Sequence, residues 1–143
     1  MSNVEEVTSV TEELRAAMRR LVPQLTIKTP PGDAELNALV KSDSSTLVVA
    51  RNGEGVIVGM ACVVVYRVPT GVRAIIEDVV VDNEARGQGL GEALTRRCLN
   101  IARARNAAHV TLTSNPAREA ANRLYRRMGF TLRDTNSYIY RFS

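Results

Sequence analysis

Hydrophobic positions in the first third of the chain recur with two different periods. Residues 3–7 predict a short strand, and apolar residues at helical spacing predict a helix from Ser9 to Leu21 that Pro23 ends. A loop over residues 26–32 follows. Asp33, as N-cap, then predicts a second helix that reaches about Ser42.

Segments rich in valine come next and favour strands. Thr46–Ala50 and Gly55–Tyr66 flank Asn52-Gly53, a dipeptide typical of a tight hairpin turn. A second turn at Pro69-Thr70-Gly71 leads into an apolar run from Arg73 to Val81 that only two acidic residues interrupt. This run predicts a central strand.

The period changes to that of a helix after Gly89, and the pattern predicts an amphipathic helix of about 16 residues. The later elements are a strand, a helix with Gly129 as its C-terminal stop, and two closing strands, at His109–Thr113, Pro116–Met128, Phe130–Arg133 and Tyr138–Phe142. The order β-α-α-β-β-β-α-β-α-β-β predicts an α/β (α+β) fold, a mixed sheet with helices on both faces.

Composition limits the class of protein. A chain of 143 residues with 45% hydrophobic side chains predicts one domain over residues 1–143. Charged residues make up 24%, and no apolar run approaches the ~20 residues that cross a bilayer, which excludes a membrane span and a disordered chain. The acidic N-terminus lacks an apolar signal core, so we expect a soluble cytoplasmic protein.

Charge is distributed unevenly. Residues 1–72 hold 7 basic and 8 acidic residues, whereas residues 73–143 hold 12 basic and 7 acidic ones. Seventeen of the 19 basic residues are arginine, which either favours forked contacts with phosphate or carboxylate, or reflects codon usage. Cys62 and Cys98 lie in apolar segments and His109 stands alone, so we expect no metal site.

The segment Arg86-Gly87-Gln88-Gly89-Leu90-Gly91 joins the central strand to the long helix. Glycines at a strand-to-helix junction let backbone N–H groups turn inward, and the helix N-terminus adds positive potential that favours phosphate. No Gly-Lys-Ser/Thr follows, and Glu92 stands where a dinucleotide loop has its third glycine. A purely structural turn remains the other reading.

Two motifs resemble one family. Arg86-x-x-Gly89-x-Gly91 is similar to the acetyl-CoA pyrophosphate loop of the GCN5-related N-acetyltransferases (GNAT). Residues 121–130, ANRLYRRMGF, are similar to the family's A-x-x-L-Y-x-x-x-G-F pattern. The resemblance covers about residues 46–143. It implies a largely antiparallel mixed sheet with a V-shaped split between two central parallel strands, at 73–81 and 109–113.

The resemblance also implies a cofactor, acetyl-CoA, and the residues that hold it. The pantetheine arm would enter the split and pair with the strand, and the pyrophosphate would meet the glycine loop. Family members often carry an Asn seven residues before the helix tyrosine, where this chain has Arg118. The implied contacts are Val79, Val80, Val81, Arg86, Gly87, Gln88, Gly89, Leu90, Gly91 and Tyr125, together with a side chain from among Asn115, Arg118 and Asn122, between which the resemblance does not choose.

The strand Ile76–Asp82 is similar to one in glucosamine-6-phosphate N-acetyltransferases, in which the Glu lies at the site of acetyl transfer. An ammonium group with a pKa near ~10 must lose a proton before it attacks the thioester. Glu77 is the candidate base, with Asp78 or water as alternatives, and strand periodicity places it on the face of Val79 and Val81. Tyr125 is the candidate acid for the departing thiolate.

The predicted function is therefore acetyl transfer from acetyl-CoA to a primary amine on a small molecule or peptide. One alternative is a sensor that binds acetyl-CoA without turnover. Another is a module that binds nucleic acid or another polyanion. The aromatic content of 4% argues against it, because few side chains are available to stack on bases. The acceptor is not indicated. By resemblance alone, a homodimer through the C-terminal strands is expected.

Overall fold

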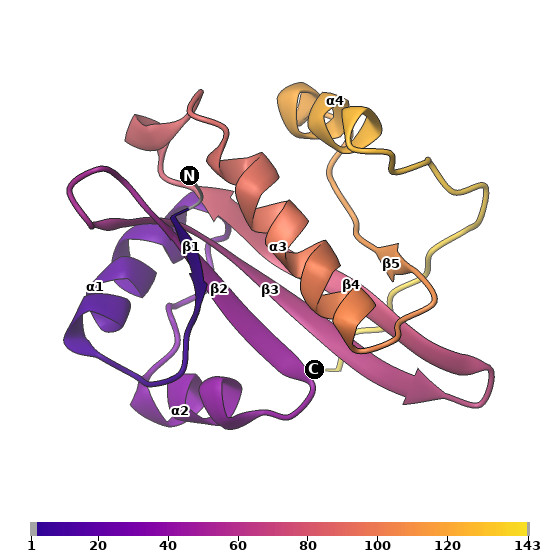
Figure 1. The fold of residues 1–143 in the computed structure, drawn as a ribbon, viewed down its shortest axis with the longest axis horizontal. Helices are drawn as coiled ribbons and strands as arrows, with labels where there is room; N and C mark the ends of the chain where they lie inside the picture. Colours follow the sequence, from indigo (N-terminus) through magenta and orange to yellow (C-terminus); the bar gives the residue numbers. More distant parts are fainter. Residues whose placement is uncertain (1–2, 143) are drawn as a thin grey trace. The chain divides into compact units, whose positions relative to one another are not determined.

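The computed structural model describes residues 3–142 and divides into two compact units. Unit 1 is Met1–Thr113 and unit 2 is Ser114–Ser143. Unit 1 contains the sheet and three of the helices drawn in Figure 1. Each unit is described by itself below.

The sheet of unit 1 has five strands in sequence order, β1-β2-β3-β4-β5. Neighbours are antiparallel except for β4 and β5, which run parallel on either side of a helical connection. The mixed, largely antiparallel sheet that the sequence predicts is thus confirmed. The strands are β1 (Val4–Glu6), β2 (Ser45–Arg51), β3 (Ile57–Val68), β4 (Gly71–Val81) and β5 (Val110–Thr111).

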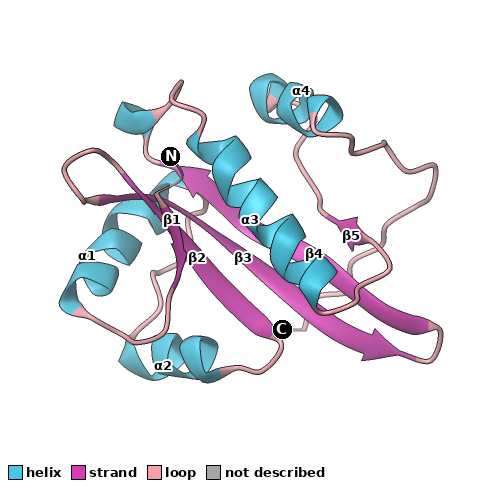
Figure 2. Ribbon diagram, in the orientation of Figure 1, coloured by secondary structure: helices cyan, strands magenta, loops and turns pink. Residues whose placement is uncertain are grey.

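Helices cover both faces of this sheet, as Figure 2 shows. On one face lie α1 (Glu12–Leu21) and α2 (Asp33–Lys41), with a 3₁₀ turn at Val22–Gln24 between them. The other face carries α3 (Leu90–Ala104). We call these the α1/α2 face and the α3 face.

Alternation along β2 and β3 supplies a core to each face. Leu47, Val49 and Met60 belong to the cluster that packs with α1 and α2. On the α3 face, β3 approaches the helix at Gly59, where an added Cβ would lie 3.1 Å from Cδ1 of Leu94. Since Leu94 is fully buried, α3 sits directly on the sheet at this point.

The first two helices differ from the sequence prediction at their N-termini: α1 begins at Glu12 and not at Ser9, and α2 has a different N-cap residue. The Thr11 side chain caps α1 by accepting from the Leu14 N–H at 3.1 Å. Gly32, not Asp33, is the N-cap of α2, and Glu35 Oε1 accepts from the Gly32 N–H at 3.2 Å. The prediction of Asp33 as cap was wrong because a carboxylate three residues into the helix satisfies the cap instead.

A β-bulge interrupts β4. The pairs Met60↔Val80 and Cys62↔Glu77 leave two residues of β4, Asp78 and Val79, opposite Ala61 alone. Asp78 has φ 54°, in the left-handed region that side chains seldom adopt. Bulges shift the alternation of a strand by one residue, so the face of each later side chain changes.

Unit 2 contains α4 (Glu119–Arg127). The helix starts three residues after the predicted Pro116, because Pro116 and Ala117 form a turn in which Asn115 Oδ1 accepts from the Ala117 N–H at 2.8 Å. Its end is as predicted: Gly129 has φ 104°, and the Phe130 N–H donates to the Tyr125 carbonyl at 2.9 Å.

The two closing strands are not formed in the described part of unit 2. Residues 130–133 and 138–142 have no strand assignment. Leu132, Tyr138 and Tyr140 are 91%, 88% and 83% exposed. The prediction of strands here was wrong because alternation marks a segment that can pair, while a strand also needs a partner edge.

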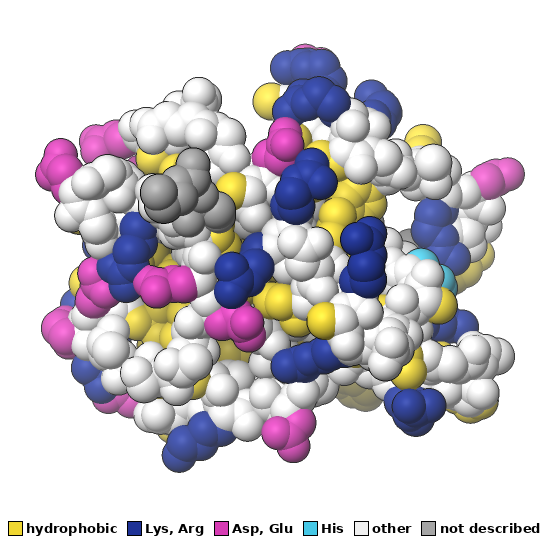
Figure 3. Space-filling view, in the orientation of Figure 1, with side chains coloured by type: hydrophobic (Ala, Val, Ile, Leu, Met, Phe, Trp, Pro, Cys, Tyr) yellow, Lys and Arg dark blue, Asp and Glu magenta, His cyan; other side chains and the backbone are white. Residues whose placement is uncertain are grey.

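The surface charge follows the division into units. Residues 1–113 hold 13 basic and 13 acidic residues, whereas residues 114–143 hold six and two, so the net charge of +4 belongs to unit 2. Figure 3 shows basic side chains on α4 and along α3. None of the helices in residues 3–142 is long and apolar enough to cross a membrane.

Candidate cofactor loop and acetyl-transfer site

The glycine loop lies where the sequence predicts it, between β4 and α3. A short 3₁₀ turn, Asn83–Ala85, follows β4 and is capped by Asp82, whose Oδ1 accepts from the Glu84 N–H at 3.2 Å. Gly87 and Gly89 have φ of 81° and 77°. An added Cβ at either would meet nothing within 4 Å, so the backbone conformation, not crowding, requires glycine there.

The loop leads into backbone donors at the N-terminus of α3. Gly89 is the N-cap of α3 and its carbonyl accepts from the Ala93 N–H at 3.1 Å. Leu90 and Gly91 open α3, and the N–H groups in the first turn of a helix have no partner within the helix. Donors at a helix N-terminus, in a field that favours negative charge, are suited to a phosphate group.

The edge of β4 toward β5 is open. The two strands pair only at Ala74↔Val110 and Ile75↔Thr111, and beyond these no described strand joins β4 on that side. The Ala74 N–H donates toward β5, to the His109 carbonyl at 3.1 Å. By strand periodicity the Ile76 N–H points the same way, toward Thr111, with which Ile75 pairs, so the open edge of β4 begins after this residue.

Glu77 lies on β4 beside this open edge and is exposed. It stands opposite Cys62, on the α1/α2 face. Because of the bulge, it shares that face with Val80, while Val81, opposite Gly59, lies on the α3 face. The prediction that Glu77 shares a face with Val79 and Val81 was therefore wrong, since an uninterrupted strand was assumed.

The side chains around Glu77 leave its charge uncompensated. Within residues 3–142, neither the Glu77 carboxylate nor the Asp78 carboxylate forms an ion pair or accepts a hydrogen bond. Burial, followed by the negative charges of Asp78 and Glu77, raises the pKa of the Cys62 thiol to about 11. Cys62 is thus a neutral thiol at neutral pH, and the two carboxylates lie close to it.

Three of the predicted cofactor residues lie together at the start of α4. The Asn122 side-chain amide donates to the carbonyls of Asn115 (3.0 Å) and Arg118 (2.8 Å), so both of its N–H groups hold this turn. The Arg118 guanidinium has no hydrogen bond or ion pair in the described part of the chain. Of the three side chains, Arg118 is the one available to an anion.

Tyr125 follows on α4, and its ring packs edge-on against Phe130 with centroids 5.7 Å apart. Burial raises the pKa of its phenol, and the nearby positive charge of Arg118 partly offsets this. A phenol with a raised pKa keeps its proton at neutral pH, as a proton donor must.

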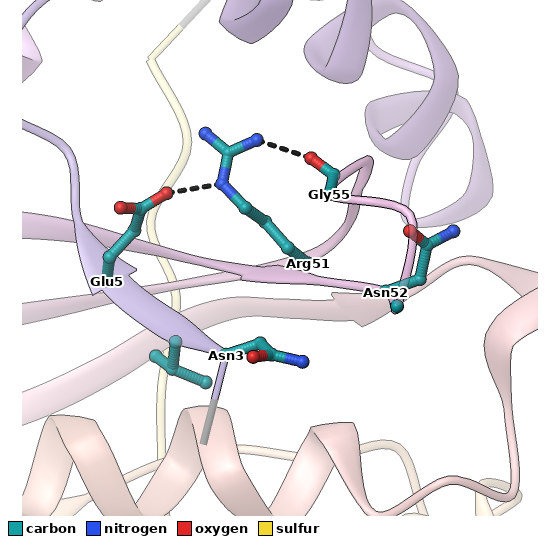
Figure 4. Close-up of a pocket in the computed structure, with 7 residues that line it drawn as sticks. Asn3, Glu5, Arg51, Asn52 and Gly55 are labelled. Carbon is teal, nitrogen blue, oxygen red and sulfur yellow. Dashed lines mark hydrogen bonds and ion pairs between the residues drawn. The ribbon is translucent and has the colours of Figure 1, made fainter. Parts of the chain in front are cut away.

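A pocket in unit 1 is lined by none of these residues and lies between β1, β2 and the turn after β2 (Figure 4). Arg51 points into it, and its guanidinium is occupied by Glu5, by both oxygens of Glu13 (2.7 and 2.8 Å) and by the Gly55 carbonyl. These bonds tie β1, α1 and the turn to β2. With its donors used inside the fold, Arg51 makes this pocket a structural junction.

Comparisons with known proteins agree with this geometry. Residues 8–130 match the family described as "Acetyltransferase (GNAT) family". Streptothricin acetyltransferase from Streptomyces lavendulae is 33% identical over 108 residues, which are 76% of this chain and 56% of that protein. Glucosamine 6-phosphate N-acetyltransferase 1 from Oryza sativa subsp. japonica is 37% identical over 65 residues, 46% of this chain and 38% of that protein.

The chain thus spans about half the length, or less, of these curated relatives. Among solved structures, a putative acetyltransferase from Agrobacterium tumefaciens str. C58 superposes with a TM-score of 0.81 at 21% identity, over 96% of this chain and 99% of that one. At that identity the likeness shows the fold.

Proposed function

Because the chain belongs to the GNAT acetyltransferase family, we propose that it transfers the acetyl group of acetyl-CoA to a primary amine on a small molecule or peptide. The observation that carries the proposal is the pairing of two unsatisfied features in unit 1. One is the first turn of α3 behind the glycine loop, whose N–H groups have no partner within the helix, and the other is the open edge of β4 after Ile76.

Acetyl-CoA fits both features by its chemistry. Its pyrophosphate is an anion for the loop donors, and its pantetheine amides can pair with the strand edge at Val79, Val80 and Val81. Arg86 and Arg118 provide positive charge, and the Asn115–Asn122 turn holds Arg118 in place. When bound, acetyl-CoA supplies an activated thioester.

The chain's own residues then manage two protons. Glu77, directly or through water, takes the proton from the acceptor ammonium, and Asp78 is the alternative base beside it. A backbone N–H on the open edge, near Val79, stabilises negative charge on the reacting carbonyl oxygen. Tyr125 donates a proton to the departing thiolate.

The family match crosses the border between the two units, since it runs from residue 8 to 130. We therefore include both units in one acetyltransferase domain. A cytoplasmic location and a homodimer stay predictions. The two curated relatives are named for the acceptors streptothricin and glucosamine 6-phosphate, both of which are small molecules with an amine.

Binding and turnover, measured separately, test the proposal. Calorimetry should detect acetyl-CoA binding, and a thiol-release assay over an amine panel should detect transfer. Tyr125→Phe should lower turnover at least tenfold, which corresponds to a rise of about 1.4 kcal/mol or more in the activation free energy. The affinity for acetyl-CoA should change little. Glu77→Gln should lower turnover and remove the low-pH limb of the pH profile.

The same measurements separate the alternatives. Binding without release for any amine would identify an acetyl-CoA sensor. Absence of binding, together with salt-dependent binding of nucleic acid, would identify a polyanion module. Normal turnover of Tyr125→Phe would reject the acid role alone.

A further inference from the structure

A strip of sheet on the α1/α2 face lies beyond the cover of the helices. Of β3, the cluster under α1 and α2 includes Ile57 and Met60 and no later described residue. The same face continues along β3 through Val64 to Tyr66, which is 36% exposed. We call the part of this face from Cys62 to Tyr66, with the paired residues of β4, the acceptor strip.

Charge is separated along the acceptor strip. Register places Glu77 opposite Cys62, Ile75 opposite Val64, and Arg73 opposite Tyr66. One end therefore carries a carboxylate, the middle is apolar, and the other end carries a guanidinium beside an aromatic ring. Glu77 and Arg73 are four residues apart on one strand, which spans about 13 Å at roughly 3.3 Å per residue.

The guanidinium of Arg73 is available. Within residues 3–142, its side-chain partner is the neutral hydroxyl of Thr70, to which Nη2 donates at 2.9 Å. This bond holds the head of the side chain at the β3–β4 turn and leaves its other N–H groups unused. Arg73 keeps its full positive charge and can bind a carboxylate or phosphate through a fork of donors.

We propose that the acetyl acceptor is an amine that also carries an anionic group, a carboxylate or a phosphate, and that Arg73 selects for this group. The amine would lie at Glu77 and the anion at the Arg73 end, with the intervening part of the acceptor over Ile75 and Val64. The charges of the strip and of such an acceptor are complementary, whereas a second ammonium at Arg73 would be repelled. The inference rests on the proposed function, because Glu77 is placed at the reacting amine by it.

Two matched pairs of acceptors test the selection and distinguish carboxylate from phosphate. Four extended residues span about 13 Å, so tetra-alanine with a free carboxylate is compared with tetra-alanine amide. A hexosamine 6-phosphate is compared with the unphosphorylated hexosamine. Binding to the full chain is measured by calorimetry, with and without coenzyme A, so that the result does not depend on turnover.

In at least one pair, the anionic acceptor should bind about tenfold more tightly or better. Arg73→Gln should abolish the difference and Arg73→Lys should retain most of it. The matched control is Arg67→Gln, because Arg67 lies on the same hairpin, pairs with Val72 and points to the α3 face. This control should bind both acceptors as the unmodified protein does.

Equal binding within both pairs, or no detectable binding of any of the four acceptors, would overturn the inference. An equal loss in Arg67→Gln and Arg73→Gln would also overturn it, since the effect would then be general electrostatics. Selective binding that depends on Arg73, without acetyl release in the thiol assay, would support the inference while it refutes the proposed transfer.

Discussion

Gly59 controls how closely α3 can lie on the sheet, and replacing it by alanine should weaken the fold. The new Cβ would lie 3.1 Å from Leu94 Cδ1 and 3.3 Å from the Val80 carbonyl oxygen. The carbonyl belongs to a paired strand and cannot move away, and Leu94 is fully buried, so α3 itself has to shift. Overpacking of this kind costs about 1–3 kcal/mol.

Urea denaturation of Gly59→Ala and the unmodified protein measures this cost as a fall in unfolding free energy. Gly53→Ala is the matched control, because its Cβ would meet nothing within 4 Å and its φ is not positive. The control should change stability by about 0.5 kcal/mol or less, or raise it slightly. Adding Leu94→Val, which shortens the clashing side chain, should recover part of the loss.

A shift of α3 also moves its N-terminus, so Gly59→Ala should weaken acetyl-CoA binding although residue 59 does not touch the loop. If Gly59→Ala were as stable as the unmodified protein, α3 would tolerate a larger residue beneath it. The packing at residue 59 would then not fix the position of the helix. If Leu94→Val brought no recovery, the strain would lie at the Val80 carbonyl instead.

Two further predictions follow from the loop and the cysteines. Gly89→Ala, at φ 77°, should cost about 1–2 kcal/mol and weaken acetyl-CoA binding. Gly55→Ala, at φ 81° in the turn between β2 and β3, should cost the same stability and leave binding unchanged. Equal binding in both variants would contradict a role for the loop. Burial raises the pKa of Cys98 to about 12 and, with the nearby carboxylates, that of Cys62 to about 11. The unfolded chain loses these protons first, so stability should be full below about pH 8.5 and fall as pH rises toward 11, by up to about 1.4 kcal/mol per pH unit for each thiol. Urea midpoints at pH 7.5 to 10 check this, and a slope that persists in Cys62→Ala/Cys98→Ala would assign it to other groups.

Local chemistry made much of the fold predictable. The glycine loop could be found because positive φ at Gly87 and Gly89 restricts those positions to glycine, and its place between a strand and a helix follows from the change of period at residue 89. The end of α4 at Gly129 is a local signal of the same kind.

Other features depend on contacts between distant residues, which a pattern along the chain does not record. The bulge at Asp78 arises because two residues of β4 face one of β3, and nothing in the run of valines marks it. As a result, the face of Glu77 relative to Val81 was predicted wrongly. The open edge of β4 and the uncovered position of Arg73 likewise depend on where β5 stops and where α1 and α2 end.

The C-terminal segment shows the limit of alternation as a signal. Tyr138, Tyr140 and Phe142 alternate as in a half-buried strand, yet all three are largely exposed in the structure. Pairing requires an edge with free donors and acceptors at the right distance, and this is a property of the assembled fold.

The brief pairing of β5, over two residues, gives the sheet a gradient of local stability. β3 is bonded to neighbours along both edges, whereas β5 is bonded to β4 at Ala74 and Ile75. Amide hydrogens of β3 should therefore exchange with solvent only when the unit unfolds globally, while those around Val110 exchange through small local openings. The pairing of β4 with β5, next to the edge proposed to hold the cofactor, can thus open and reclose many times during the lifetime of the folded core.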